Sequence, residues 1–199
     1  MDDSEIDSDL WSSRNSSMAT ISQYNGTLHI NASEKSNSSA DFFSREAFKP
    51  NITLRFKGNV SKGQGSDYKG MGFLRGNIGH DKEGLQEGVY WLGEEKNLFV
   101  RHKYSAAESS TLASDYRPFK SKYEAEYKTW QIKWLESSIE YQLDDRSLSP
   151  ENAGIPEKSI NIGFSINTSY QAYPSEIFLD WILAYTPAIT GPKAIVETD

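Results

Sequence analysis

The sequence predicts an all-β protein, an antiparallel β-sandwich of the jelly-roll type in which two sheets pack against each other. Short runs of alternating apolar and polar residues recur along the 199 residues, which is the period of a half-buried strand. Turn-forming Gly, Pro, Asn and Ser separate these runs at regular spacing. Only "AAESSTLAS", at 106–114, suits a short helix. These observations favour a sandwich over any helical or mixed fold.

The N-terminal third contains three predicted strands. "SMATISQYNGTLHINAS", at 17–33, indicates two strands around Asn25-Gly26, because Asn-Gly between alternating apolar residues is the strongest short hairpin signal. A polar loop is expected at 33–40. "NITLRFKGN", at 51–59, then places Ile52, Leu54 and Phe56 on one face.

The middle of the chain contains shorter strands and longer loops. "YKGMGFLRG", at 68–76, is a strand interrupted by glycines, between polar loops at 60–67 and 77–87. "GVYWLG" (88–93) and "LFVRHKY" (98–104) form a predicted hairpin, and residues 105–121 are irregular.

The C-terminal part has the clearest alternation. "YKTWQIKWLESSIEYQLDD", at 127–145, predicts a strand pair with Trp130, Ile132 and Trp134 on one face. Because an Ile shares the face of both Trp residues, that face belongs to the core. After a Pro/Gly loop at 147–157, "SINIGFSIN" (159–167) is a further strand. "SEIFLDWILAY" (175–185) is predicted to be buried on both faces apart from Asp180.

The chain is predicted to contain one domain, at 11–187. Residues 1–10 are predicted to be a flexible acidic segment, and 188–199 a tail or linker.

Composition disfavours or excludes several classes of function. The net charge of −7 disfavours nucleic acid or an anionic membrane as a partner. The chain has no Cys, which excludes disulfides and a Cys nucleophile. No apolar run reaches the ~18 residues of a membrane span.

The sequence is rich in Asn-X-Ser/Thr sequons, which indicate an extracellular or cell-surface glycoprotein. Chance would supply roughly two in a chain this rich in Ser and Thr. The alternative is that Ser-rich loops create sequons by accident. The candidate glycosylation sites are Asn15, Asn25, Asn31, Asn37, Asn51, Asn59 and Asn167.

Three segments resemble, in order, the concanavalin A-like lectin/glucanase superfamily. "WSSRNSSMATISQYNGTLHI" (11–30) has an early Trp before an "NGTL" strand, and "YKTWQIKWLESSIEYQLDD" (127–145) resembles the superfamily's Y-x-I-x-W…I-x-F-Y-V-D-G hairpin. "IFLDWILAY" (177–185) is similar to its closing V-D-W-V-R-V-Y strand. The resemblance implies a jelly roll. It leaves function open among lectins, carbohydrate-binding modules, laminin-G-like adhesive modules and family 16 glucanases.

The glucanase branch carries a Glu-x-Asp-x-Glu type motif on a central strand. "EIDSD", at 5–9, is similar but precedes the first strand and ends in Asp. The strand that would carry the motif, 88–93, has no carboxylate. Glu124 and Glu126 remain as the candidate acid/base pair, because alternation puts them on one face. The sequence therefore favours a protein without hydrolase activity.

A structural Ca²⁺ site is a second expectation from the resemblance. Several jelly rolls of this type bind Ca²⁺ with an Asp of the last strand and oxygens near the N-terminus. Asp180 occupies the matching position in "IFLDW", and Asp7 and Asp9 supply further hard oxygens. A carboxylate in an apolar strand can instead pair with an Arg or Lys, and the simplest alternative is a hydrogen bond that Asp180 accepts from a neighbouring backbone group or Ser.

Sugar sites combine an aromatic face with hydrogen-bonding side chains. The sequence suggests a cleft lined by Trp91, Arg101, Lys103 and Gln131, with Tyr90 and Lys133 beside it. The alternative is a merely solvated sheet face.

The leading hypothesis is a non-catalytic extracellular module that binds a polysaccharide or adheres to cell-surface proteins. A structural surface protein that assembles through its sheets is the second hypothesis, and a glycoside hydrolase or polysaccharide lyase is the third.

Overall fold

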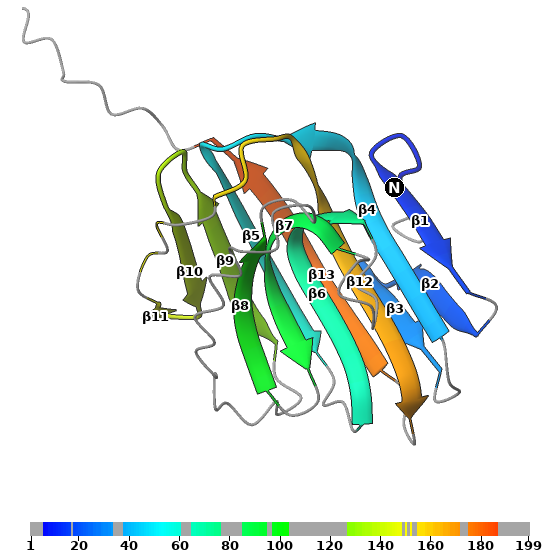
Figure 1. The fold of residues 1–199 in the computed structure, drawn as a ribbon. Helices are drawn as coiled ribbons and strands as arrows, with labels where there is room; N and C mark the ends of the chain where they lie inside the picture. The colour runs from blue at the N-terminus through cyan, green and yellow to red at the C-terminus, as the bar shows by residue number, and fades with distance from the viewer. Residues whose placement is uncertain are drawn as a thin grey trace, which may run out of the picture.

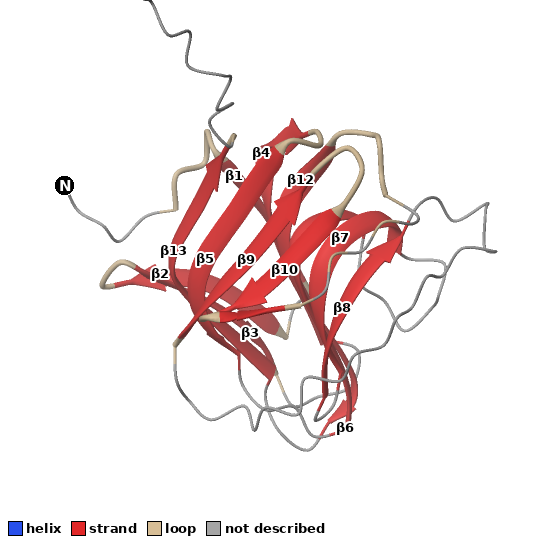
Figure 2. Ribbon diagram, turned by 90° about the vertical axis from the view of Figure 1, so that its left-hand side faces the viewer, coloured by secondary structure: helices blue, strands red, loops and turns tan. Residues whose placement is uncertain are grey.

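Two antiparallel sheets packed against each other make up the fold (Figure 1). The structure is a computed structural model that describes residues 6–16, 18–33, 38–60, 65–76, 85–94, 97–103, 127–148, 150, 152, 155–171 and 175–186. Within these residues the regular elements are all strands (Figure 2), so the predicted all-β sandwich is confirmed. The described residues contain no helix capable of crossing a membrane.

Each sheet interleaves strands from distant parts of the chain. Sheet A contains, in spatial order, β1 (Trp11–Asn15), β4 (Ser38–Phe48), β12 (Ile160–Gln171), β6 (Gly65–Gly76), β7 (Leu85–Glu94) and β8 (Asn97–Lys103). Sheet B contains β11 (Arg146–Ser147), β10 (Ile139–Leu143), β9 (Lys128–Trp134), β5 (Ile52–Val60), β13 (Ser175–Tyr185), β3 (Thr27–Ala32) and β2 (Ala19–Tyr24). The last two strands, β12 and β13, therefore lie inside the sheets rather than at their edges.

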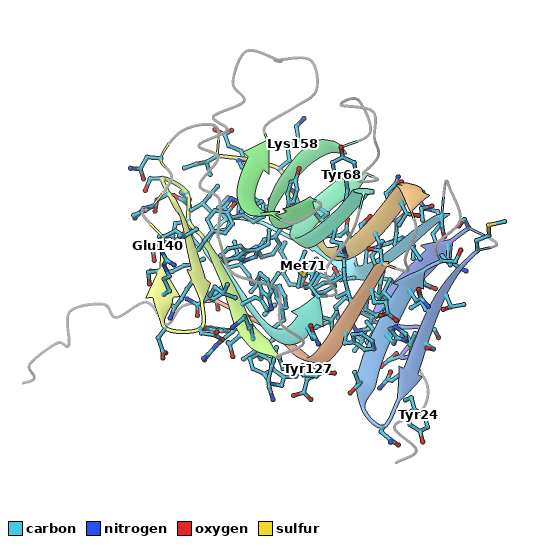
Figure 3. The ribbon with its side chains drawn as sticks, turned by 90° about the horizontal axis from the view of Figure 1, so that it is seen from below. Tyr24, Tyr68, Met71, Tyr127, Glu140 and Lys158 are labelled. Atoms are coloured by element: carbon cyan, nitrogen blue, oxygen red, sulfur yellow. The ribbon has the colours of Figure 1, made fainter. Side chains whose placement is uncertain are left out.

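The core lies between the two sheets, and the predicted alternation builds it. Trp130, Ile132 and Trp134 of β9 are all buried, as the sequence predicts. Phe56 of β5 packs edge to face on Phe164 of β12, with ring centroids 5.1 Å apart. Figure 3 shows Met71 of β6 in this same layer. The contacts therefore join sheet A to sheet B through large apolar side chains.

The predicted hairpin at Asn25-Gly26 is also confirmed. β2 and β3 pair directly, and Tyr24 lies opposite Thr27. Asn25 and Gly26 have φ values of 49° and 75°, which two-residue hairpin turns of type I′ require. A glycine reaches such values without steric cost.

The sequence prediction misses three strands, β1, β4 and the two-residue β11, and β4 is the longest of them. Residues 38–48 form β4, although the polar loop expected at 33–40 covers its first residues. Ser38, Asp41 and Ser44 are buried in it, and these polar residues hide the apolar alternation. Each is satisfied inside the protein; the Ser38 hydroxyl, for example, donates to the Met18 carbonyl at 2.9 Å.

The prediction that 175–185 is buried on both faces is wrong: Glu176 and Phe178 are only partly buried, and the exposed face changes beyond Leu179. The pairing of β13 with β5 shifts between Leu179 and Trp181, so Asp180 is the extra residue of a β-bulge. Ile177 and Leu179 point into the core before the bulge, whereas Ile182 packs against it afterwards. The bulge thus reverses which residues face solvent.

Candidate functional site

The open face of sheet A carries a hollow of about 210 Å³. We call it the sheet A hollow. Three strands that are adjacent in the sheet but distant in sequence build it, together with the edge strand β1. Its outward-facing lining residues are Arg14, Asp41, Phe43, Leu74, Asn161, Gly163 and Ser165.

A buried carboxylate anchors the polar side of the hollow. The side chain of Asp41 is 8% exposed and pairs with Arg14, whose side chain is 65% exposed. Arg14 donates from Nε and Nη2 to Asp41 Oδ2 at 3.2 and 3.0 Å. Ser165 Oγ donates to Asp41 Oδ1 at 2.6 Å. Both oxygens are therefore engaged, and Arg14 is held with part of its guanidinium in solvent.

The apolar side of the hollow comes from Phe43 and Leu74. Phe43 lies opposite Gly163 in the pairing of β4 with β12. A Cβ at Gly163 would lie 3.1 Å from Leu74 Cβ, so the glycine allows Leu74 to pack closely against β12. Together these residues place an aromatic ring and an aliphatic side chain beside the Asp41 network.

Asn161 lines the hollow at the place where the pairing of β12 with β4 is irregular. The pairing shifts between Asn161 and Gly163. Asn161 Nδ2 donates to the Ser44 carbonyl at 2.8 Å, and Ser44 Oγ accepts from the Ile162 amide at 2.9 Å. These bonds satisfy the backbone of the bulge and hold the hollow's shape.

The hollow combines an aromatic ring, an aliphatic wall and hydrogen-bonding groups, which is the chemistry of a saccharide site. Glycoside hydrolysis needs two carboxyl groups ~5–9.5 Å apart. Among the described lining residues Asp41 is the one carboxylate, and both of its oxygens already accept hydrogen bonds. Glu124 and Glu126 lie outside the described residues, so their role stays a prediction.

The predicted cleft around Trp91 is wrong. Trp91 is 0% exposed and packs edge to face on Trp130 and Tyr141, with ring centroids 5.4 Å away in each case. Tyr90, the next residue, is 1% exposed. Neither ring offers a face to a ligand, because successive residues from 88 to 91 are all buried, so this part of the strand is covered on both sides rather than on one.

The remaining members of that cleft belong to different surfaces. In β8, Arg101 and Lys103 pair with Tyr90 and Gly88, which places their backbones in sheet A. Gln131 lies in sheet B, where its Nε2 donates to Gln142 Oε1 at 3.1 Å. Lys133 lies on the same side of β9 as Gln131, and its Nζ is 3.3 Å from Glu140 Oε2. No single groove can contain the buried Trp91 together with Gln131.

The structure brings two of the three predicted metal ligands together. Asp7 and Asp180 line one cavity of about 270 Å³, with Gln23 beside them. Asp7 Oδ1 accepts from the Asp9 amide at 2.9 Å, while Asp9 itself does not line the cavity. Two carboxylates and an amide oxygen are of the hard type that Ca²⁺ prefers.

A lysine competes for this site. Asp180 Oδ2 accepts from Lys57 Nζ at 2.8 Å, which is the alternative that the sequence left open. The described residues contain no cluster of three or more His, Cys, Asp or Glu side chains. The oxygen set fits a cation in type, and Lys57 already balances one of its charges.

The sequons occupy unequal positions. Asn25 is exposed in the hairpin turn and Asn51 is exposed beside a second turn. Asn15 is also exposed, whereas Asn31, Asn59 and Asn167 lie within strands and are partly buried. Asn37 lies outside the described residues.

Sequence reasoning missed the residues of the sheet A hollow. Arg14, Asp41, Phe43 and Ser165 come from three strands and share no spacing or motif along the chain. The one available signal is an Asp directly after the Ser-rich segment 33–40, and it is equally typical of a polar loop.

Comparison with solved structures supports the fold. A lichenase from a mouse hindgut metagenome is 14% identical, with a TM-score of 0.68 over 93% of this chain and 96% of that one. A Thermotoga petrophila laminarinase is 13% identical, with a TM-score of 0.67 over 92% and 94%. A Bacteroides ovatus family 16 hydrolase, solved with the product G4G4G3G, is 11% identical, with a TM-score of 0.64 over 90% and 96%.

These likenesses establish a concanavalin A-like jelly roll, as the three sequence segments predict. At 11–14% identity they establish the fold alone. The sequence matches no protein-family model, and no curated protein is detectably similar to it.

Proposed function

We propose that the protein is an extracellular module that binds a polysaccharide in the sheet A hollow. The observation that carries the proposal is the buried Asp41, held by Arg14 and Ser165 beside the ring of Phe43. Burying a carboxylate beside apolar groups is unfavourable unless it is paired, and here the pairing holds an exposed guanidinium at the rim. That group can donate to sugar hydroxyls while Phe43 contacts a sugar ring.

β-Glucans are the first ligands to test. Similar solved structures are named as enzymes that act on mixed-linkage and β-1,3-glucans, and one of them holds a mixed-linkage product. The likeness in fold supports a ligand of the same chemical class, a neutral chain of pyranose rings.

Binding to laminarin and to mixed-linkage β-glucan is measured by isothermal titration calorimetry. Phe43→Ala is expected to raise Kd about tenfold, the equivalent of ~1.4 kcal/mol. Tyr24→Ala is the matched control, because Tyr24 is an exposed aromatic of the β2–β3 hairpin, 75% exposed. Equal binding by the wild type and Phe43→Ala, or no binding to any neutral polysaccharide, would exclude the hollow as the site.

A hydrolase is the second candidate, and the fold shared with glucanases favours it. Glu124 and Glu126 are the proposed acid/base pair. The test is release of reducing sugar from the same two glucans by the wild type. Activity that Glu124→Gln or Glu126→Gln abolishes would establish hydrolysis, whereas no release leaves binding as the function.

We also propose a structural Ca²⁺ ion held by Asp7 and Asp180. Both side chains line one cavity with Gln23, and the ion would tie the N-terminal turn to β13. Lys57, which pairs with Asp180, would have to move aside or share the carboxylate.

A further inference from the structure

The outer face of sheet B presents a row of apolar side chains to solvent. Trp181, Leu183 and Tyr185 follow one another at every second position of β13, and they are 37%, 51% and 40% exposed. We call them the aromatic strip. The bulge at Asp180 places them outside, whereas the smaller Ile182 and Ala184 pack against the core.

Cationic and polar side chains lie next to the aromatic strip on β5. Lys57 lies opposite Trp181, and Arg55 lies opposite Leu183. The Arg55 guanidinium carbon is 5.9 Å from the centroid of the Trp181 ring, and Lys57 Nζ is 5.8 Å from the centroid of the Tyr127 ring. Figure 2 shows β13, β5, β9 and β10 side by side, and Figure 3 shows Tyr127 directed away from the interior.

On this face, Arg55 has no carboxylate partner among the described residues. Three lysines of β5 and β9 are neutralised by ion pairs, Lys57–Asp180 at 2.8 Å, Lys128–Asp144 at 3.3 Å and Lys133–Glu140 at 3.3 Å. Arg55 is exposed, and its one recorded partner is the ring of Trp181. Arg55 therefore places an unneutralised positive charge beside Trp181, on a protein with a net charge of −7.

We propose that the aromatic strip and Arg55 form a second glycan-binding surface, which takes a polysaccharide carrying carboxylate or sulfate groups. A guanidinium held over an indole at this distance has N–H groups left to form bidentate bonds to such a group. The flat rings of Trp181 and Tyr185 stand ~13 Å apart along the strand, a distance that spans several sugar rings of an extended chain. This surface lies on the opposite side of the sandwich from the sheet A hollow and does not depend on it.

A second copy of the chain fits the strip less well. Three side chains at this exposure offer on the order of 250 Å² of apolar surface, whereas a stable dimer buries about 800 Å² per partner. Polar Gln131 and the paired Lys133 continue the face on β9. Aromatic rings interleaved with hydrogen-bonding groups suit a hydrated sugar chain better than an apolar protein surface.

The test measures binding to alginate, which carries carboxylates, to κ-carrageenan, which carries sulfates, and to neutral laminarin. Trp181→Ala and Arg55→Gln are each expected to raise Kd for one or both polyanions about tenfold. Tyr24→Ala, an exposed aromatic on the same sheet at the end of the hairpin (Figure 3), is expected to leave Kd unchanged. Phe43→Ala is expected to leave polyanion binding unchanged, which separates this surface from the sheet A hollow.

Binding to alginate would identify carboxylate as the recognised group, and binding to κ-carrageenan would identify sulfate. Either result supports the proposal. Three results would overturn it. The first is no binding to either polyanion, and the second is polyanion binding that Trp181→Ala and Arg55→Gln leave unchanged. The third is a dimer in analytical ultracentrifugation that Trp181→Ala abolishes. Melting curves of both variants serve as the control for folding. Both are expected to fold, because both side chains are on the surface.

Discussion

The indole of Trp91 meets the indole of Trp130 edge to face, with ring centroids 5.4 Å apart and ring planes at 76°. One ring comes from β7 of sheet A and the other from β9 of sheet B. The pair therefore links the two layers, and Trp91 stabilises the sandwich instead of contacting a ligand.

Trp91→Ala is expected to lower the free energy of unfolding by about 3–5 kcal/mol, because it removes a large side chain from a packed core. Urea denaturation followed by fluorescence or circular dichroism measures the change. Tyr24→Ala is the control and should change stability by less than ~0.5 kcal/mol. A Trp91→Ala protein of unchanged stability would contradict the interior position of this ring.

Ser165→Ala should destabilise the protein by about 1–3 kcal/mol, because it deprives the buried Asp41 carboxylate of a hydrogen-bond donor. The lost bond is the 2.6 Å contact to Oδ1. Ser22→Ala, an exposed serine of β2, is the matched control. If both variants unfold at the same denaturant concentration, the network does not contribute to stability.

Removal of Ca²⁺ with EDTA should lower the melting temperature, because a ligand that binds only the folded state stabilises it. Added CaCl₂ should restore the original value. Asp180→Asn should abolish the shift, whereas Asp145→Asn, in an exposed turn, should retain it. If EDTA does not change the melting temperature, the Ca²⁺ proposal is wrong and the ion pair with Lys57 accounts for Asp180.

Among the six sequons in the described part of the chain, Asn25 should be the most readily glycosylated when the protein is secreted from a eukaryotic host. It is exposed in the hairpin turn. By contrast, Asn15 Nδ2 donates to the Ala19 carbonyl at 2.7 Å and Asn51 Nδ2 to Glu136 Oε1 at 3.0 Å. Intact mass spectrometry of Asn25→Gln should show the loss of one glycan, and an unchanged mass would refute the assignment.

The strands that alternate cleanly were predictable from the sequence, and those interrupted by buried polar groups were not. The period of two along 127–145 identifies Trp130 and Trp134 as core residues, because each strand there has one face toward solvent and one toward the core. The same rule fails at Trp91, because its neighbour Tyr90 is also buried. Exposure of alternate residues depends on what covers the far side of a sheet, and local sequence does not contain that information.

The candidate site was less predictable than the fold. The hollow depends on cross-strand neighbours such as Asp41 and Ser165, which are 124 residues apart. The aromatic strip depends on a single extra residue in β13, because without the bulge Trp181 would face the interior. Both features follow from register, which spacing along one strand cannot reveal.

The positions of β12 and β13 determine when the protein can fold. β12 separates β4 from β6, and β13 separates β3 from β5, although both strands come last in the chain. A ribosome must therefore release almost all of the described sequence before either layer can close. Contacts between such distant segments slow folding, and a prematurely terminated chain would present unpaired strand edges that promote aggregation.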